Sequence, residues 1–333
     1  MVLRAIITSQ QQQRRHGVED EEEEEEGEEE DLERGGGDRK KARRRARPWW
    51  MLVVAGLFFG GSAITSRAEA PPSSYQKPVV AFNATGVENL VMVAGHAVTI
   101  TESLNGVDRN DRHWYLLDYQ RGKDLPGEFV AHVRKGVEMA HEDERALLVF
   151  SGGQTRSDAG PRSEAQSYYF IAEHFGWWGH PDVAARTATE EFARDSFENV
   201  LFSLCRFAEI ANDTYPRRVA VVSFDFKRRR FADVHAKALR LPNFRYVPMN
   251  PHETNPESRF DRREAEDGER RTLRTFLRDP FGCGRVLARK RQSRDPFRRS
   301  VPYGPRCPAM APLLTHCGPT ASFNHTLPWD NTS

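Results

Sequence analysis

The sequence of 333 residues lacks the short motifs that mark several common enzyme classes. It contains neither a G-x-S-x-G nucleophile elbow nor a Walker loop, which argues against an ordinary esterase and against a P-loop nucleotidase. No segment repeats with the period of about 20–50 residues that solenoids and propellers need. The chain has only four cysteines, and none of their spacings fits a zinc site. The sequence therefore predicts no metal centre and names no cofactor.

Net charge is also small, because the formal sum is only +1, but this sum hides a strong segregation. Residues 19–31 are almost wholly acidic, whereas residues 39–47 hold seven basic side chains in nine positions. Such runs repel themselves and bury no surface, so residues 1–47 are predicted to form a disordered, charged cytoplasmic tail. The basic run alone would also fit nucleic-acid binding or nuclear import. Its position directly before an apolar segment argues against nucleic acid as the partner.

Long apolar runs are scarce, and the main one covers residues 49–65 without a single charge. Basic residues crowd its N-terminal side and two tryptophans open it, so residues 48–66 are predicted to be a transmembrane signal anchor. The rest of the chain would then be lumenal, in a membrane of the secretory pathway such as the endoplasmic reticulum or the Golgi. A buried core helix or strand pair, or a signal peptide cleaved after Ala68-Glu69-Ala70, are the alternatives.

A lumenal domain would suit two further features of the sequence. Four glycosylation sequons begin at Asn83, Asn212, Asn324 and Asn331, which suggests a glycoprotein. Cys205 lies in an apolar helical pattern and is expected to be a buried thiol. Among Cys283, Cys307 and Cys317, one pair could form a disulfide, and the sequence leaves that pairing open.

Strand and helix patterns alternate after a linker at residues 67–87. The strand patterns are continuous apolar runs, as expected when both faces of a parallel sheet are covered. Residues 88–250 are therefore predicted to form an α/β domain, a Rossmann-like parallel sheet with helices on both faces. Residues 251–333 are rich in arginine and proline, and we expect this extension to lie over the domain without a second core. The predicted strands are 89–94, 146–150, 218–224 and 244–247, and the predicted helices are 128–140, 163–175, 195–211, 231–239 and 262–277.

The segment Ser151-Gly152-Gly153 follows one predicted strand, at the sheet edge where ligands gather. Glycines let the backbone turn sharply and approach a ligand closely. The next helix begins behind Ser163, which can cap it in a capping box with Gln166. With Arg156 and Arg162 between strand and helix, this N-terminus predicts an anion site, most readily for phosphate. The alternative is a plain connection with solvated arginines.

Two more loops carry ionisable groups. Glu190 precedes a helix for which Asp195 is the expected cap, and Asn199 would lie in its first turn. Lys227 and Arg230 follow another strand and could face an anion or only water. Several titratable groups at one sheet edge are what acid–base chemistry requires, although capping and surface pairing would use the same residues.

The order LVMVAGH, LLVFSGGQTR, EEFARDSFEN and VAVVSFDFKRRRF resembles the SanA/YdcF-like family, domain of unknown function 218, in its eukaryotic membrane-anchored branch. The resemblance covers about residues 88–250 and includes the segment around Asp295–Pro308. It implies a Rossmann-like fold with a ligand pocket at the strand ends. The family commonly has a histidine where Lys227 stands, and His96 is the candidate to take over its role. Family motif positions fall on Gly95, Ser151, Gly152, Gly153, Ser163, Glu164, Glu190, Glu198, Asn199 and Arg230.

Two functions remain open at this point. The first is an enzyme acting on a phosphorylated, nucleotide-linked or lipid-linked substrate, in which protons are handled by His96, Glu190 or Asp195. The second is a non-catalytic module that binds a nucleotide-like or methyl-donor ligand. In both cases the ligand-binding residues are predicted to be Gly95, Ser151, Gly152, Gly153, Arg156, Ser163, Glu164, Asn199, Lys227 and Arg230.

Overall fold

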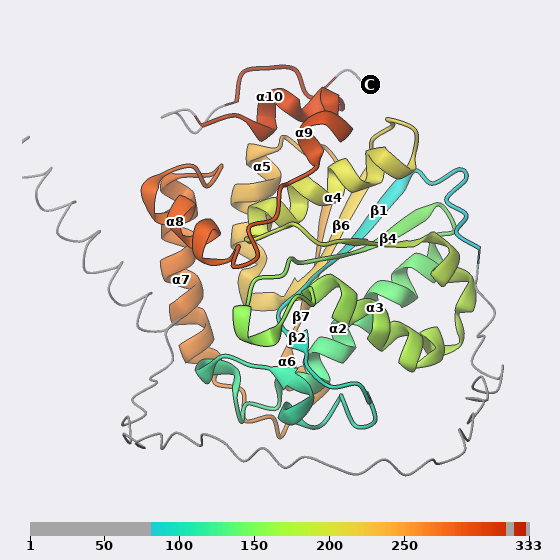
Figure 1. The fold of residues 1–333 in the computed structure, drawn as a ribbon, viewed down its shortest axis with the longest axis vertical. Helices are drawn as coiled ribbons and strands as arrows, with labels where there is room; N and C mark the ends of the chain where they lie inside the picture. The colour runs from blue at the N-terminus through green and yellow to red at the C-terminus, as the bar shows by residue number, and fades with distance from the viewer. Residues whose placement is uncertain (1–80, 318–322, 331–333) are drawn as a thin grey trace, which may run out of the picture.

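The computed structural model describes residues 81–317 and 323–330 (Figure 1). Five parallel strands form one sheet in the order β5-β4-β1-β6-β7, and a two-stranded antiparallel sheet pairs β2 with β3. The predicted α/β architecture with a parallel sheet is therefore confirmed. The strands are β1 (Asn89–Ala94), β2 (Val98–Thr99), β3 (Trp114–Tyr115), β4 (Ala146–Ser151), β5 (Thr187–Glu190), β6 (Arg218–Phe224) and β7 (Phe244–Met249).

Helices cover both faces of the sheet (Figure 1). Alternate residues of β1 point to opposite faces, so Leu90 and Met92 join one buried cluster while Val91 and Val93 join the other. Helices α2 and α3 supply the second cluster, and α4 with the helical segment 230–238 supplies the first. The helices are α2 (Leu125–Glu142), α3 (Glu164–His174), α4 (Ser196–Ile210), α5 (Ala236–Ala238), α6 (Pro251–Thr254), α7 (Arg262–Arg278), α8 (Arg285–Ser293), α9 (Tyr303–Arg306) and α10 (Ala311–Leu314).

The C-terminal extension packs on the face that carries α4. Its buried side chains Tyr303, Met310 and Trp329 belong to the hydrophobic cluster to which α4 also contributes. A disulfide joins Cys283 to Cys317, which resolves the pairing that the sequence left open, and Cys307 is a buried free thiol like Cys205. The extension thus completes the core of one domain.

The predicted architecture needs one correction. Among the helices of the described ranges, none combines the length and the apolar character that a membrane span requires. Residues 48–66, which the sequence predicted to be the transmembrane anchor, and the tail at 1–47 lie outside the described residues. For residues 81–317 and 323–330 the structure supports an α/β domain, and none of the helices in these ranges could span a membrane.

The sheet topology determines where a ligand site can form. From β1 the chain moves outward through β4 and β5, and it then returns to the other side of β1 to add β6 and β7. The connections after β1 and after β6 therefore lead away from each other. A crevice opens at the carboxyl ends of two strands where such a reversal occurs.

Candidate functional site

A cavity of about 290 Å³ lies at this reversal. Gly95 and His96, which follow β1, line one part of its wall, and Phe224 and Lys227 at the end of β6 line another. The extension contributes residues of α7 and α8, so the cavity is completed by segments far apart in sequence. Its place at the strand ends is where an open α/β sheet offers a binding site.

Eight of the thirteen residues predicted for the site line this cavity. The other five lie outside the lining, and two of these, Ser151 and Glu190, belong to a buried network that reaches the cavity through Asn199. The structure therefore brings together residues from all three predicted loops. The lining residues among those predicted are Gly95, His96, Arg156, Glu164, Asp195, Asn199, Lys227 and Arg230, and those outside the lining are Ser151, Gly152, Gly153, Ser163 and Glu190.

Gly95 and Gly152 leave space for the side chain of Glu164, and their backbone does not itself form an anion site. A Cβ on Gly95 or on Gly152 would lie 2.5 Å from an atom of Glu164, so both positions must lack a side chain. A Cβ on Gly153 would similarly lie 2.5 Å from the carbonyl oxygen of Ala193. These close approaches bring the start of α3 against the ends of β1 and β4.

The first N–H groups of α3 are satisfied within the protein. The amides of Glu164 and Ala165 donate to the carbonyls of Gly153 and Gly152, and Ser163 Oγ accepts from the Gln166 amide at 2.9 Å. Ser163 is thus the helix cap that the sequence predicted. An anion in the cavity would therefore be held by side chains, because this N-terminus has no donor left in its first three amides.

Glu164 reaches into the cavity from the first turn of α3. Thr155 donates a hydrogen bond to Glu164 Oε1 at 3.2 Å. Burial raises the pKa of the Glu164 carboxyl, although the nearby charges of Arg156 and Lys227 oppose the shift. A carboxyl with a raised pKa holds its proton more firmly than an exposed glutamate, which suits a group that exchanges protons with a ligand.

A buried network supports the cavity floor. Ser151 Oγ donates to Glu190 Oε2 at 2.8 Å and lies 3.1 Å from Asn199 Oδ1. Glu190 Oε1 accepts from the Phe192 amide and from the Tyr303 hydroxyl. Burial raises the pKa of Glu190 to about 7 in spite of these donors. Glu190 therefore acts on the site through Ser151 and Asn199, because it does not line the cavity.

Lys227 and His96 form the central polar contact of the cavity. Lys227 Nζ lies 3.4 Å from His96 Nδ1, and Ser223 Oγ lies 3.2 Å from His96 Nε2. Burial, followed by the charge of Arg230, lowers the pKa of Lys227 to about 7. Burial and the charge of Lys227 also lower the pKa of His96 well below its usual value. His96 is consequently neutral near physiological pH, and Lys227 is divided between the neutral amine and the ammonium ion.

Arg230 is committed to a buried ion pair. Its guanidinium donates to both carboxylate oxygens of Glu269, at 2.8 and 2.7 Å, and its third nitrogen donates to Ser196 Oγ at 2.7 Å. Ser196 Oγ lies 2.8 Å from His235 Nε2, while His235 Nδ1 has no hydrogen-bond partner among the described residues. Burial lowers the pKa of His235 well below its usual value, so this imidazole is neutral.

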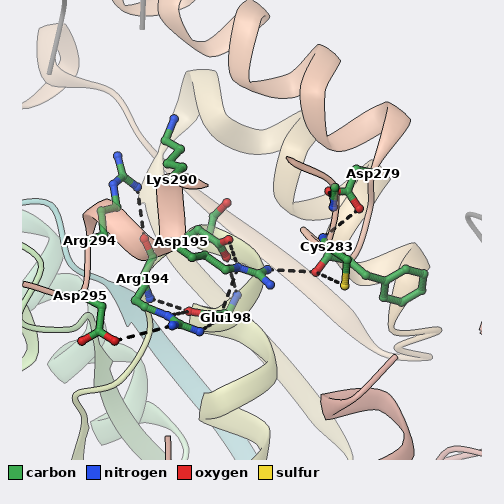
Figure 2. A network of polar contacts seen from close by, with 12 residues as sticks. Arg194, Asp195, Glu198, Asp279, Cys283, Lys290, Arg294 and Asp295 are labelled. Atoms are coloured by element: carbon green, nitrogen blue, oxygen red, sulfur yellow. Dashed lines mark hydrogen bonds and ion pairs between the residues drawn. The ribbon is translucent and has the colours of Figure 1, made fainter. Parts of the chain in front are cut away.

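Asp195 caps α4 and binds the extension (Figure 2). Its Oδ1 accepts from the Glu198 amide at 2.9 Å, and its Oδ2 accepts from Arg291 Nε at 2.6 Å. Burial would raise the pKa of Asp195, but the Arg291 guanidinium holds it below its usual value. Figure 2 shows the neighbouring pair of Arg194 and Glu198 in the same network. Both carboxylate oxygens of Asp195 are therefore already engaged.

Positive charge exceeds negative charge on the cavity wall. Arg156, Lys227 and Arg271 line it, and within the described ranges none of the three forms an ion pair with a carboxylate. The lining carboxylates Asp195 and Glu269 are instead neutralised by arginines. This excess of cations favours an anionic ligand.

One wall of the cavity is aromatic. The rings of Phe224, Phe226 and Phe260 all line it and lie nearly parallel, with centroids 5.2 to 6.2 Å apart. Lys227 Nζ lies 5.4 Å from the centroid of Phe224. Flat apolar faces beside cations suit a ligand that carries both a planar group and an anionic group.

Sequence reasoning missed several residues of the site. Ser196 is identifiable only as a first-turn residue of α4, and His235 lies in a helix with no motif around it. Glu269, Arg271 and Phe260 belong to the extension, which shows no strand-end signal. Arg162, which the sequence placed beside Arg156, donates to the Thr99 carbonyl at 2.9 Å and does not line the cavity.

A possible metal-binding group lies at the opposite end of the sheet. His141, His180 and Asp182 bring three ligand atoms within 4.8 Å of one another. His141 stands near the end of α2, just before β4 begins, so it is remote from the strand ends that border the cavity. Among the described residues, no such group occurs in the cavity itself.

Comparisons with known proteins give one relative. The chain is similar to the uncharacterized protein YOR238W of Saccharomyces cerevisiae, with 28% identity over 232 residues, which covers 57% of this chain and 76% of the yeast protein. No family model matches the chain, and no solved structure matches it. The description of the yeast protein gives no activity, so the similarity transfers no function.

These results correct three descriptions drawn from the sequence. The comparisons give no support to membership of the SanA/YdcF-like family. The structure gives no membrane-spanning helix in the part of the chain that it describes. Nothing in either supports a glycoprotein.

Proposed function

We propose that this protein binds a phosphorylated small molecule with a planar, nucleotide-like portion in the cavity between β1 and β6. The observation that carries this proposal is the pair of cations Arg156 and Arg271, which line the cavity and form no ion pair with a carboxylate of the described residues. Lys227 lies in the same lining, and its pKa of about 7 leaves it partly charged at neutral pH. Arginine side chains bind phosphate through charge-assisted hydrogen bonds. The stacked phenylalanines beside them would take the planar group.

Catalysis on the bound molecule is favoured over passive binding. Three neighbouring groups of the cavity, His96, Glu164 and Lys227, have pKa values displaced toward neutrality or below their usual range by burial. Displaced pKa values that converge in one cavity are characteristic of acid–base sites. A non-catalytic module would need the cations and the aromatic wall but would have no use for a neutral lysine.

We also propose that the protein is located in an oxidising compartment. The disulfide between Cys283 and Cys317 supports it, because such bonds persist mainly in the secretory pathway and outside the cell.

Titration calorimetry with AMP, adenosine and inorganic pyrophosphate tests the binding proposal at low ionic strength. AMP and pyrophosphate should bind, and adenosine should bind much more weakly because it lacks the charge. Arg156→Ala and Arg271→Ala should each weaken AMP binding by roughly tenfold to a hundredfold, the value of one charge-assisted hydrogen bond.

Arg134→Ala is the matched control. Arg134 is an exposed arginine of α2 that pairs with Glu138 and does not line the cavity. Its loss should leave affinity and thermal stability unchanged. If AMP binds equally well to the wild type and to both cavity variants, the cavity is not the phosphate site.

A further inference from the structure

Two lysines with different surroundings face the cavity. Lys123 donates to Glu264 Oε2 at 3.0 Å and so has a carboxylate partner. Lys227 forms no ion pair with a carboxylate among the described residues, and its Nζ instead lies 3.4 Å from His96 Nδ1. The two side chains share one cavity but differ in their partners, because Lys123 contacts a carboxylate and Lys227 contacts an imidazole.

The contact with His96 determines how the Lys227 amine can react. With Nε2–H donating to Ser223 Oγ, the Nδ1 lone pair of a neutral imidazole accepts an N–H of Lys227. The nitrogen lone pair of the amine then remains available to an electrophile. The rings of Phe224 and Phe226 lie 5.4 and 5.8 Å from Nζ and present apolar faces on which a conjugated group could stack.

Resting on the proposed binding of a phosphorylated ligand, we propose that Lys227 is a nucleophilic catalytic residue that forms an imine with the carbonyl carbon of a phosphorylated aldehyde or ketone. The phosphate lies on Arg156 and Arg271, and the carbonyl faces Nζ. Glu164, whose carboxyl interacts electrostatically with Arg156 and Lys227, also lines the cavity.

The reaction balances without any further reagent. Nζ attacks the carbonyl carbon, and a proton passes from nitrogen through His96 Nδ1 to the carbonyl oxygen to give a carbinolamine. The carbon–oxygen bond then breaks and the oxygen leaves as water with the second amine proton, so that a carbon–nitrogen double bond forms. No electron is gained or lost overall. The lowered pKa of Lys227, about 7, means that about half of the amine is neutral at pH 7.

Pyridoxal 5′-phosphate is a suitable probe, because it combines a phosphate, a planar ring and an aldehyde. The full chain is incubated with it at pH 7, reduced with borohydride and digested, and each lysine is assayed for the reduced adduct by mass spectrometry. Lys227 should be labelled at least about tenfold faster than Lys123 and the exposed Lys237, because the lowering of its pKa to about 7 leaves much of its amine neutral at pH 7.

Substitutions distinguish the loss of the reactive amine from unfolding of the protein and from the loss of phosphate binding. Lys227→Met and Lys227→Arg should both lose the adduct, whereas Lys123→Arg should keep it. Pyridoxine 5′-phosphate, which carries the phosphate but no carbonyl, should still bind to Lys227→Arg and should lose affinity in Arg156→Ala. Retention of that binding also shows that the variant is folded.

The outcomes distinguish the two proposals. If pyridoxine 5′-phosphate binds through Arg156 but Lys227 is labelled no faster than Lys123, the imine proposal is wrong and phosphate binding stands. If pyridoxine 5′-phosphate does not bind and Lys227 is not labelled, both proposals fall. Selective labelling of Lys227 that Arg156→Ala slows tenfold or more supports both.

Discussion

At the scale of single residues, burial determines which ionisable groups are poised for chemistry. Glu190 and Asp195 are both buried carboxylates at one sheet edge, and the sequence proposes both as proton carriers. Arg291 pairs with Asp195, whereas Glu190 meets only neutral donors. The pKa of Asp195 is therefore lowered and that of Glu190 is raised to about 7.

Glu190 should make the protein less stable as the pH rises. The folded protein keeps this proton up to about pH 7, while the unfolded chain releases it near the ordinary value of 4.5. The free energy of unfolding should therefore fall by roughly 3 kcal/mol across that window. Glu190→Gln should remove this part of the slope and should be the more stable protein at pH 8.

Urea unfolding of wild type and Glu190→Gln at pH 5, 6, 7 and 8 measures the effect. The difference between the two curves isolates Glu190, because His132, with a lowered pKa of about 4, and Lys227 contribute equally to both. A difference that does not change with pH would show that Glu190 is ionised throughout.

At the scale of elements, helix caps differ in what they support. Asp195 caps α4 and also binds Arg291 from α8, and both side chains are largely buried. Asp261 caps α7 through the Glu264 amide, and that contact is exposed to solvent. Removal of the first cap should therefore disturb the attachment of the extension as well as the helix.

Asp195→Ala should cost about 3 kcal/mol or more, and Asp261→Ala about 1 kcal/mol. The smaller value is that of an ordinary cap, and the larger one includes a buried arginine left without its main partner. Asp195→Asn should fall between them, because the amide oxygen can still accept from Glu198. Chemical denaturation of the three variants gives these values, and equal costs for the two alanine variants would mean that the Arg291 pair adds nothing.

The sequence predicts the elements better than it predicts the site. Apolar runs such as 89–94 and 218–224 identify buried strands, and the cap residues Ser163 and Asp195 locate two helix starts. Strand β5 is not predicted, because its sequence Thr187-Ala-Thr-Glu has neither length nor a continuous apolar character. Strands and helix starts can be predicted from the local sequence because residues close together along the chain determine them.

The cavity could be predicted only in part, for a related reason. The strand-end loops supply Gly95, Arg156 and Lys227, and the parallel topology brings them together. The arginines Arg156 and Arg162 look alike in sequence, yet only the first faces the cavity. Residues such as Glu269 and Phe260 enter through long-range packing of the extension, which no local pattern encodes.

At the scale of the whole molecule, one covalent bond closes the extension on itself. The disulfide between Cys283 and Cys317 links residues 34 positions apart around α8, α9 and α10. Because α8 supplies Arg291 to Asp195 and also lines the cavity, this loop supports the site.

Replacement of both cysteines by alanine should lower the free energy of unfolding by about 3–4 kcal/mol, the entropy of closing a loop of this length. Dithiothreitol should lower the stability of the wild type to a similar extent and should leave the double variant unchanged. Urea midpoints with and without the reductant measure both effects. A wild type that is equally stable in its reduced form would contradict the stabilising role.

The central position of β1 in the sheet has a consequence for folding during synthesis on the ribosome. This apolar strand is the first of the sheet to be synthesised, yet one of its neighbours is β6, and the paired residues Asn89 and Arg218 lie 129 positions apart. At ordinary rates of synthesis the strand would wait roughly 6 to 26 seconds for that neighbour. During this time one hydrogen-bonding edge of the strand is unmatched and is open to pairing with other chains.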